Sequence, residues 1–204
     1  MGLTSLAHKP PNNAMSANYF SDETYTNLNF QEAPLTRGEY EQCTFRGCNF
    51  SGVDLSEIVL VDCVLEDCDL SSANFNQTGL RDVQFRQCKM LGLRFEYCQP
   101  FLFSVGFVGC TLNLSTFFRC GLKSTKFDHC QLHEVDFSEA DLSGATFTEC
   151  EMQGATFDQT TLVKADFRHA TGYALDPEKN KLKNARFSRE GLAGLLIKYQ
   201  LKIE

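Results

Sequence analysis

Residues 130–169 read, in blocks of five, CQLHE VDFSE ADLSG ATFTE CEMQG ATFDQ TTLVK ADFRH. The third residue of each block is large and apolar, the first is small or compact, and the other three are mostly polar. A period of five fits neither an amphipathic helix, whose period is about 3.6, nor the simple alternation of a strand. A short fixed period of this kind predicts a repeat architecture.

The same period extends over most of the 204-residue chain. Large residues recur every five positions from Phe20 to Phe95, slip by two positions within 96–106, and resume from Phe107 to Phe167. Residues 1–17 show no period, and we expect a flexible N-terminal tail there. We therefore expect a repeat region over 18–187, with a register slip at 96–106, and a separate terminal element over 188–204.

Blocks such as Ala140-Asp141-Leu142-Ser143-Gly144 and Ala165-Asp166-Phe167 resemble the pentapeptide-repeat family. The resemblance implies an all-β solenoid, a right-handed quadrilateral β-helix of about seven coils with one pentapeptide on each of its four sides. The large central residue and the small residue two positions before it would both point inward.

Residues twenty apart would then stack at the parallel-strand spacing of about 4.8 Å. One inward column would hold Phe107, Phe127, Phe147 and Phe167, and the opposite column Phe117, Phe137 and Phe157. Each coil would bury its inner face by stacking on the next coil.

The sequence has ten cysteines. Nine occupy the small inward position of the repeat, and Cys98 does so too if the first phase continues to Pro100: Cys43, Cys48, Cys63, Cys68, Cys88, Cys110, Cys120, Cys130 and Cys150. We expect them to fill the core as small hydrophobic residues rather than to bind metal or take part in redox chemistry. No CxxC pair occurs in the sequence. Buried free thiols favour a reducing compartment, so we expect a cytoplasmic protein.

The C-terminal residues change to a helical spacing after Ser188, which is a good helix N-cap. An amphipathic α-helix is predicted from apolar residues at i, i+3, i+4 and i+7, followed by a short strand from two alternating apolar residues: Leu192, Leu195, Leu196, Tyr199, Leu201 and Ile203. This element would cover the open end of the solenoid. The family resemblance also implies a homodimer formed through it.

No catalytic or metal-binding pattern stands out. His129 and His133 are four apart, a spacing that suits a metal on a helix, but on the five-residue period both face solvent across a corner. The sequence has no glycine-rich phosphate loop and no GxSxG motif. We therefore expect a protein that is not an enzyme and needs no cofactor or metal.

The charge pattern offers candidate contact residues. Residues 47–80 hold six acids and no Lys or Arg: Asp54, Glu57, Asp62, Glu66, Asp67 and Asp69. Residues 127–163 hold eight acids and no Lys or Arg, among them Glu134, Asp136, Glu139 and Asp141. Either the repeat favours Asp before its centre and acids for solubility, or rings of negative charge imitate the charge density of a DNA duplex.

The slip itself contains the segment Pro100-Phe101-Leu102-Phe103. Phe101 and Phe103 either pack across the change of register or form a loop that contacts a partner.

Net charge and hydropathy limit the classes of partner that the chain can bind. The net charge of −7 disfavours direct binding to nucleic acid or to an anionic membrane, and no apolar run is long enough for a membrane helix. The chain resembles the quinolone-resistance subgroup of the family, which implies a DNA mimic whose protein partner is DNA gyrase. The alternative is a cytoplasmic interaction scaffold with another protein partner.

Overall fold

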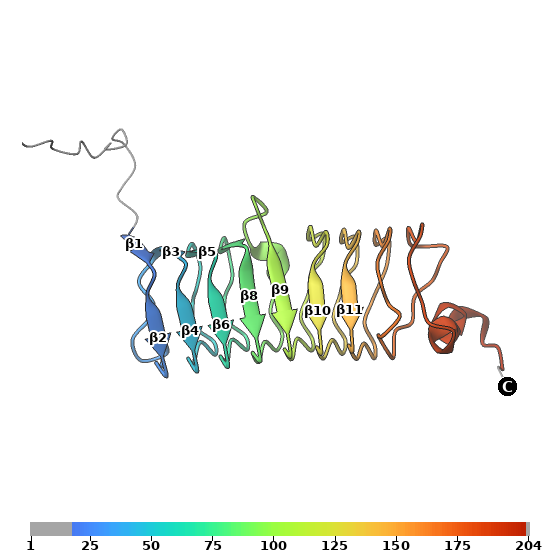
Figure 1. Ribbon diagram of the computed structural model, residues 1–204, viewed down its shortest axis with the longest axis horizontal. Helices are drawn as coiled ribbons and strands as arrows, with labels where there is room; N and C mark the ends of the chain where they lie inside the picture. Colours follow the sequence, from blue (N-terminus) through green and yellow to red (C-terminus); the bar gives the residue numbers. More distant parts are fainter. Residues whose placement is uncertain (1–17, 203–204) are drawn as a thin grey trace, which may run out of the picture.

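The computed structural model describes residues 18–202, which form a long rod of stacked coils with the first and last described residues at opposite ends (Figure 1). The strands are short, and the helical segments are three 3₁₀ turns. In chain order the elements are β1 (Asn18–Ser21), β2 (Thr24–Thr26), β3 (Gly38–Glu41), β4 (Thr44–Arg46), β5 (Val59–Val61), β6 (Val64–Glu66), β7 (Gly79–Arg81), β8 (Val83–Arg86), η1 (Phe95–Tyr97), β9 (Val105–Val108), β10 (Lys126–Asp128), β11 (Thr146–Thr148), η2 (Glu190–Leu195) and η3 (Ile197–Tyr199).

Two parallel sheets run along the rod, and each strand pairs with the strand one coil away. One sheet has the order β1-β3-β5-β7, and the other has the order β11-β10-β9-β8-β6-β4-β2. The register places Phe45 against Leu65 and Leu60 against Leu80, an offset of twenty residues. Isolated bridges such as Asn49 to Asp69 and Asp54 to Asn74 join the coils on the other two sides. The predicted four-sided β-solenoid is therefore confirmed.

The central residues of the repeat form a continuous apolar core. Phe127 stacks on Phe107 and on Phe147 with ring centroids 5.1 Å apart in both pairs. Phe117 of the opposite column meets Phe127 edge to face at 6.1 Å. Burying each ring contributes about 1.5–3 kcal/mol, and a well-placed aromatic pair adds about 0.5–1.5 kcal/mol.

The ten cysteines all lie in this core, and none forms a disulfide. Most of their thiols approach backbone carbonyls both of their own coil and of the coil before: those of Cys43, Cys48, Cys63, Cys68, Cys88, Cys110 and Cys150. The Cys88 Sγ, for example, lies 3.4 Å from the Leu65 oxygen and 3.3 Å from the Arg86 oxygen. The prediction that the cysteines fill the core is confirmed.

Most corners of the coil have a left-handed backbone at the second residue after the centre. Gly52, Asp62, Glu134 and Gly144 hold this position with φ of 66°, 51°, 56° and 71°. Glycine, Asn and Asp tolerate this conformation best, which explains why small and polar residues close the pentapeptide. The chain can therefore turn every five residues without a longer loop.

The register slip adds two residues to one coil. Val83 pairs with Val105 and Arg94 with Thr116, so the offset here is 22 residues instead of twenty. The extra residues lie in the segment after η1, which rises as a loop beside β9 (Figure 1). Phe103 packs against the core, whereas Phe101 is 66% exposed. The two candidate phenylalanines of the slip thus have different environments.

The predicted C-terminal α-helix is wrong. Residues 190–199 form the 3₁₀ segments η2 and η3 instead, with Leu196 between them and a left-handed Gln200 after them. Gly191 and Gly194 weaken an α-helix by about 1 kcal/mol each relative to alanine. A Cβ at Gly194 would lie 2.3 Å from the Tyr173 carbonyl oxygen, so the turn is fitted closely to the last coil.

The cap nevertheless packs on the end of the solenoid. Ser188 Oγ accepts a hydrogen bond from the Gly191 N–H at 3.0 Å, and the Leu175 N–H donates to the Gly194 carbonyl at 3.1 Å. Leu195 packs against the core. Leu201 and Lys202 are not in a strand, and Ile203 lies outside the described residues. Within 18–202, no helix is long and apolar enough to cross a membrane.

Candidate protein-interaction surfaces

The first surface is the N-terminal acidic belt, defined as Asp54, Glu57, Asp62, Glu66, Asp67 and Asp69. Asp54 and Asp69 precede a central residue, and each accepts a backbone hydrogen bond at the next corner, from Ser56 at 3.1 Å and from Ser71 at 2.9 Å. Hydrogen bonds from Ser56 lower the pKa of Asp54. These two carboxylates therefore help to build the coil.

Cations one coil away neutralise much of this belt. Arg46 pairs with Glu66 at 2.8 Å, Lys89 with Asp69 at 3.3 Å, and Arg37 with both Glu57 at 3.3 Å and Asp54 at 3.5 Å. Asp62 and Asp67 are exposed and form no ion pair with any other residue in 18–202. The belt thus contributes two unpaired carboxylates at successive corners of one coil.

In the second acidic segment, 127–163, some carboxylates likewise bond within the rod and others have no ion pair. Asp136 and Asp141 accept backbone hydrogen bonds from Ser138 at 2.9 Å and Ser143 at 3.1 Å. Arg119 pairs with Glu139 at 2.7 Å, and Lys123 pairs with Asp141 at 3.3 Å. Glu134 is exposed and has no ion pair within the described part of the chain. Its corner follows a different side of the coil from those of Asp62 and Asp67, so the structure does not gather the three into one patch.

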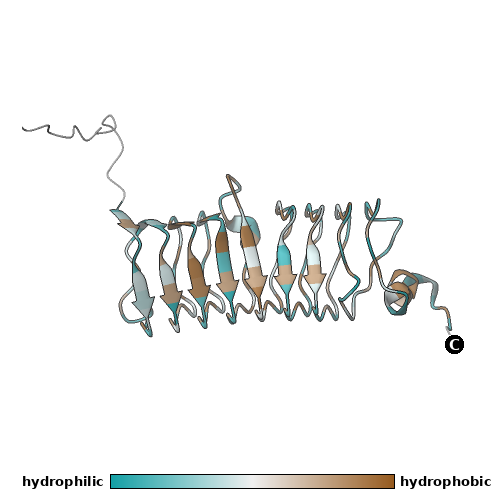
Figure 2. Cartoon of the chain, viewed as in Figure 1, coloured by the Kyte–Doolittle hydropathy of each residue, from teal (hydrophilic) through white to brown (hydrophobic). Residues whose placement is uncertain are grey.

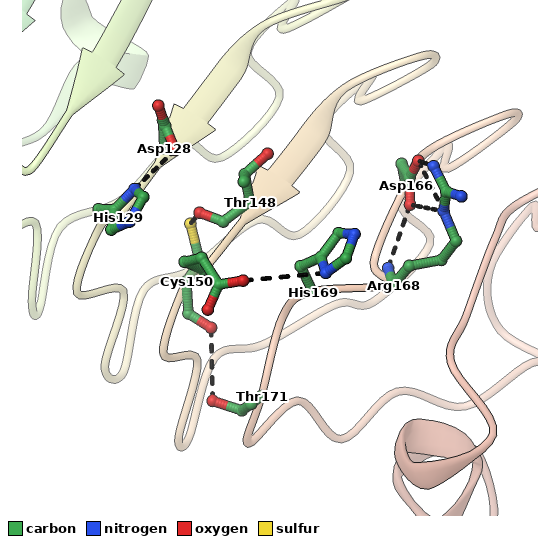
Figure 3. Close-up of polar contacts among 9 residues, drawn as sticks. Asp128, His129, Thr148, Cys150, Asp166, Arg168, His169 and Thr171 are labelled. Carbon is green, nitrogen blue, oxygen red and sulfur yellow. Dashed lines mark hydrogen bonds and ion pairs between the residues drawn. The ribbon is translucent and has the colours of Figure 1, made fainter.

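Within 18–202, the histidines lie on the surface in separate pairs with acids. Asp128 contacts the His129 Nδ1 at 2.8 Å, and Glu149 contacts the His169 Nδ1 at 3.8 Å, on neighbouring turns (Figure 3). His133 Nε2 lies 3.3 Å from Glu151. Among residues 18–202, no three His, Cys, Asp or Glu side chains gather to hold a metal ion. His129 and His133 are thus placed on the surface, as the five-residue period predicts.

An aromatic patch surrounds the register slip. We define the slip patch as Tyr97, Phe101, Leu102 and Phe118. Three of its rings lie against guanidinium groups: Arg81 over Phe101 at 5.7 Å, Arg94 over Tyr97 at 4.4 Å and Arg119 over Phe118 at 4.7 Å. Tyr97 and Phe118 were not predicted from the sequence, although a large apolar residue at an outward position of the repeat is a signal that could have found them.

A hollow of about 290 Å³ lies beside this patch. We call it the slip hollow. Its lining comes from η1, the loop after it and the start of the next coil: Phe95, Glu96, Cys98, Pro100, Leu102, Phe103, Phe118, Arg119, Cys120 and Gly121. The hollow exists because the two extra residues lift the chain off the line of stacked coils.

The C-terminal cap presents a second apolar surface. Leu192, Ile197, Tyr199 and Leu201 are all exposed, with Ile197 at 57%, and brown residues mark these turns in Figure 2. Leu196 is half-buried. Lys198 fixes η3 to the preceding segment through ion pairs with Asp176 at 2.7 Å and Glu178 at 2.8 Å. These bonds raise the pKa of Lys198, so the cap is held by a charged group at neutral pH.

Comparison with known sequences identifies the family. The profile of the pentapeptide repeat region matches residues 58–131 and 120–196, which together are more than half of the chain. The protein therefore belongs to the pentapeptide-repeat family. A search of curated proteins finds no match to this chain.

Two solved structures resemble this chain to different degrees. HetL, a pentapeptide repeat protein involved in heterocyst differentiation regulation in Nostoc, is 19% identical over 83% of this chain and 86% of its own, with a TM-score of 0.53. Full-length QnrB1, a plasmid-mediated fluoroquinolone resistance protein, is 19% identical over 90% of this chain and 100% of its own, with a TM-score of 0.44. The match to HetL shows a common fold and no more.

Proposed function

We propose that this protein is a non-catalytic interaction rod that binds a protein partner through exposed side chains on its rigid coils. The observation that carries the proposal is the slip patch. Phe101 and Leu102 are 66% and 63% exposed in a chain whose central repeat residues are almost all buried. Exposed apolar patches mark binding sites, and aromatic residues together with arginines are enriched at protein interfaces.

The test is an affinity capture from cell extract followed by identification of the captured proteins. Phe101→Ser with Leu102→Ser should lower the yield of a specific partner about tenfold, equivalent to about 1.4 kcal/mol. Leu28→Ser is the matched control, because Leu28 is 44% exposed far from the slip. Equal capture by the wild type and the double variant would show that the slip patch is not the contact.

DNA gyrase is a second, narrower candidate for the partner, with DNA mimicry as the mechanism. The support for it is the net charge of −7 and the exposed pair Asp62 and Asp67, which have no ion pair within 18–202. The ion pairs along the rod reduce the negative potential that mimicry requires, so the general binding role remains the main proposal.

A gyrase supercoiling assay, with and without a fluoroquinolone, tests the narrower candidate. Mimicry predicts inhibition or drug protection at micromolar protein, and loss of both in Asp62→Lys with Asp67→Lys. Asp22→Lys with Glu190→Lys is the control, since it changes the net charge equally at the two ends of the rod. The absence of any effect of the wild-type protein would exclude gyrase.

The exposed cap supports a further part of the proposal, a homodimer formed end to end through η2 and η3. Apolar residues such as Leu192, Ile197, Tyr199 and Leu201 would be covered by a second copy. Light scattering should give twice the chain mass, and Ile197→Lys should give the monomer mass. A monomeric wild type at high concentration would remove the dimer from the proposal.

The ten reduced cysteines support a reducing compartment, and we place the protein in the cytoplasm on that ground. Fractionation of the source cells with a specific antibody tests this assignment. Recovery of the protein outside the cytoplasm would contradict it.

A further inference from the structure

The slip hollow contains a carboxylate that the fold leaves incompletely bonded. The Glu96 side chain is only 12% exposed. Its Oε1 accepts a hydrogen bond from Arg94 Nε at 2.9 Å, whereas its Oε2 is buried and has no hydrogen-bond partner among the described residues. A buried carboxylate oxygen without a donor is unfavourable, so the site favours a ligand that supplies one.

The rest of the lining is mostly apolar. Phe95, Phe103 and Phe118 contribute rings, Pro100 and Leu102 form the loop side, and a Cβ added at Gly121 would meet no atom within 4 Å. Burial and then the charge of Glu96 raise the pKa of Cys120 to about 12, which indicates that the carboxylate acts across the hollow. Burial, followed by the charge of Cys120 and then that of Glu96, raises the pKa of Cys98.

The loop that forms the hollow is fixed at both ends. Gln99 Nε2 donates to the Gln77 carbonyl at 2.9 Å, and Ser104 Oγ donates to Asp82 at 2.7 Å. Arg81 lies over the Phe101 ring at 5.7 Å. A site built on such a fixed loop needs little ordering when a ligand enters it.

We propose that the slip hollow receives a lysine or arginine side chain of a protein partner, whose cation bonds to Glu96. The aliphatic stem of such a side chain packs on the apolar walls while its charged end reaches the carboxylate. Rotation about the last torsion of Glu96, which is a broad two-fold rotor, turns either oxygen toward the entering donor. This inference rests on the proposed protein-binding role and adds that the partner contributes a basic side chain to the contact.

The other charges around the hollow are already engaged. Arg119 donates to Glu139 at 2.7 Å and lies over the Phe118 ring, and Arg94 occupies one oxygen of Glu96. The second oxygen of Glu96 is therefore the remaining strong acceptor of the lining. Because an apolar pocket with one buried acceptor favours a cationic donor, an acidic or purely apolar side chain fits it less well.

Titration of short blocked peptides into the ¹⁵N-labelled protein tests the proposal by NMR. Acetyl-Gly-Lys-Gly-amide and acetyl-Gly-Arg-Gly-amide should shift amide signals of residues 95–104 and 118–121, with a dissociation constant of about 1 mM, typical of a single contact. Acetyl-Gly-Gln-Gly-amide is the uncharged comparison. Equal shifts with all three peptides, or no shift with any, would overturn the proposal.

Two variants locate the site. Glu96→Gln keeps the shape and removes the charge, and Gly121→Leu fills the hollow while leaving the carboxylate in place. Each should weaken the binding of the basic peptides at least tenfold, whereas Glu66→Gln, at a half-buried acid paired with Arg46, should leave it unchanged. If Glu96→Gln does not fold, Gly121→Leu decides the question alone.

The same variants separate this inference from the proposed function. Partner capture that survives Glu96→Gln and Gly121→Leu but fails with Phe101→Ser and Leu102→Ser would overturn the cation site and leave the interaction role intact. Loss of peptide binding and of partner capture in the same variants would support both.

Discussion

At the scale of single residues, the second residue after each centre controls whether the chain can turn. Gly52 is at this position, whereas Gly121 comes directly before the centre Leu122. A Cβ at either glycine would meet no atom within 4 Å. Gly52 has a φ of 66°, whereas Gly121 does not adopt a positive φ. The two glycines therefore differ in backbone conformation and not in the space around them.

Alanine at these two positions should have opposite effects on stability. Gly52→Ala should lower the free energy of unfolding by about 1–2 kcal/mol, because a side chain disfavours the left-handed region. Gly121→Ala should raise it by about 0.4–1 kcal/mol, because the unfolded chain loses freedom. Urea denaturation measures both, and equal effects would mean that the corners do not depend on φ.

The buried thiols predict a weakness at alkaline pH. Burial raises the pKa of Cys63 to about 11, from a usual value of about 9. Above the usual value the unfolded state loses its proton first, so the stability contributed by this thiol is complete below about pH 9 and is lost as the pH rises toward 11. The urea midpoint should fall across this interval, and Cys63→Ala should make the fall less steep. An identical pH profile for both proteins would contradict the assignment.

At the scale of elements, the loop after η1 is a regular repeat with two residues inserted. Without Pro100 and Phe101 the sequence from Cys98 would read CQLFS followed by VGFVG, two ordinary pentapeptides with Leu102 and Phe107 at their centres. The slip is therefore a local insertion in a continuous solenoid and does not mark a boundary between domains.

Deletion of Pro100 and Phe101 should restore the offset of twenty residues and close the slip hollow. We expect the melting temperature to stay the same or rise, because Leu102 moves from solvent into the core. Circular dichroism during heating measures this, and the peptide titrations should then show no binding. A deletion variant that fails to fold would mean that the loop is needed for the core.

The C-terminal cap provides a test of the difference between the expected α-helix and the observed 3₁₀ turns. In an α-helix, Gly194→Ala would stabilise the protein by about 1 kcal/mol. In the structure, the new Cβ would lie 2.3 Å from the Tyr173 carbonyl oxygen, so the same change should destabilise it. The sign of the shift in the urea midpoint decides between them, and Ala193→Ser, at an exposed neighbour, serves as the control.

The sequence alone predicts the coil because the inward residues recur at a fixed spacing of five. Phe107, Phe127 and Phe147 stack as their spacing indicates. The cap was predicted wrongly because its conformation depends on Tyr173, a contact that no local spacing reveals. The ion pairs could have been found, since Arg46 and Glu66, Arg119 and Glu139, and Asp69 and Lys89 are each twenty residues apart, one full coil.

At the scale of the whole molecule, stability is shared between neighbouring coils and is lowest where a coil has a single neighbour. Within 18–202, the coil that holds β1 and β2 stacks on one other coil, while β9 lies between β8 and β10. Local opening should therefore begin at the N-terminal coil.

Hydrogen exchange measures this gradient. The backbone amides of β9 and β10 should exchange at least about tenfold more slowly than those of β2, a difference of about 1.4 kcal/mol in opening free energy. Uniform protection along the rod would indicate that all coils unfold as one cooperative unit.

The inserted pair of residues has a consequence for how a partner finds its place. A rod made of equivalent coils offers the same contact at every step of about 4.8 Å, so a bound molecule could shift along it by whole steps without a change in energy. The slip removes that translational symmetry, because its loop and hollow occur once between the regular coils. A partner that contacts the slip is therefore held at one position along the rod, and its distance to every other surface residue is fixed.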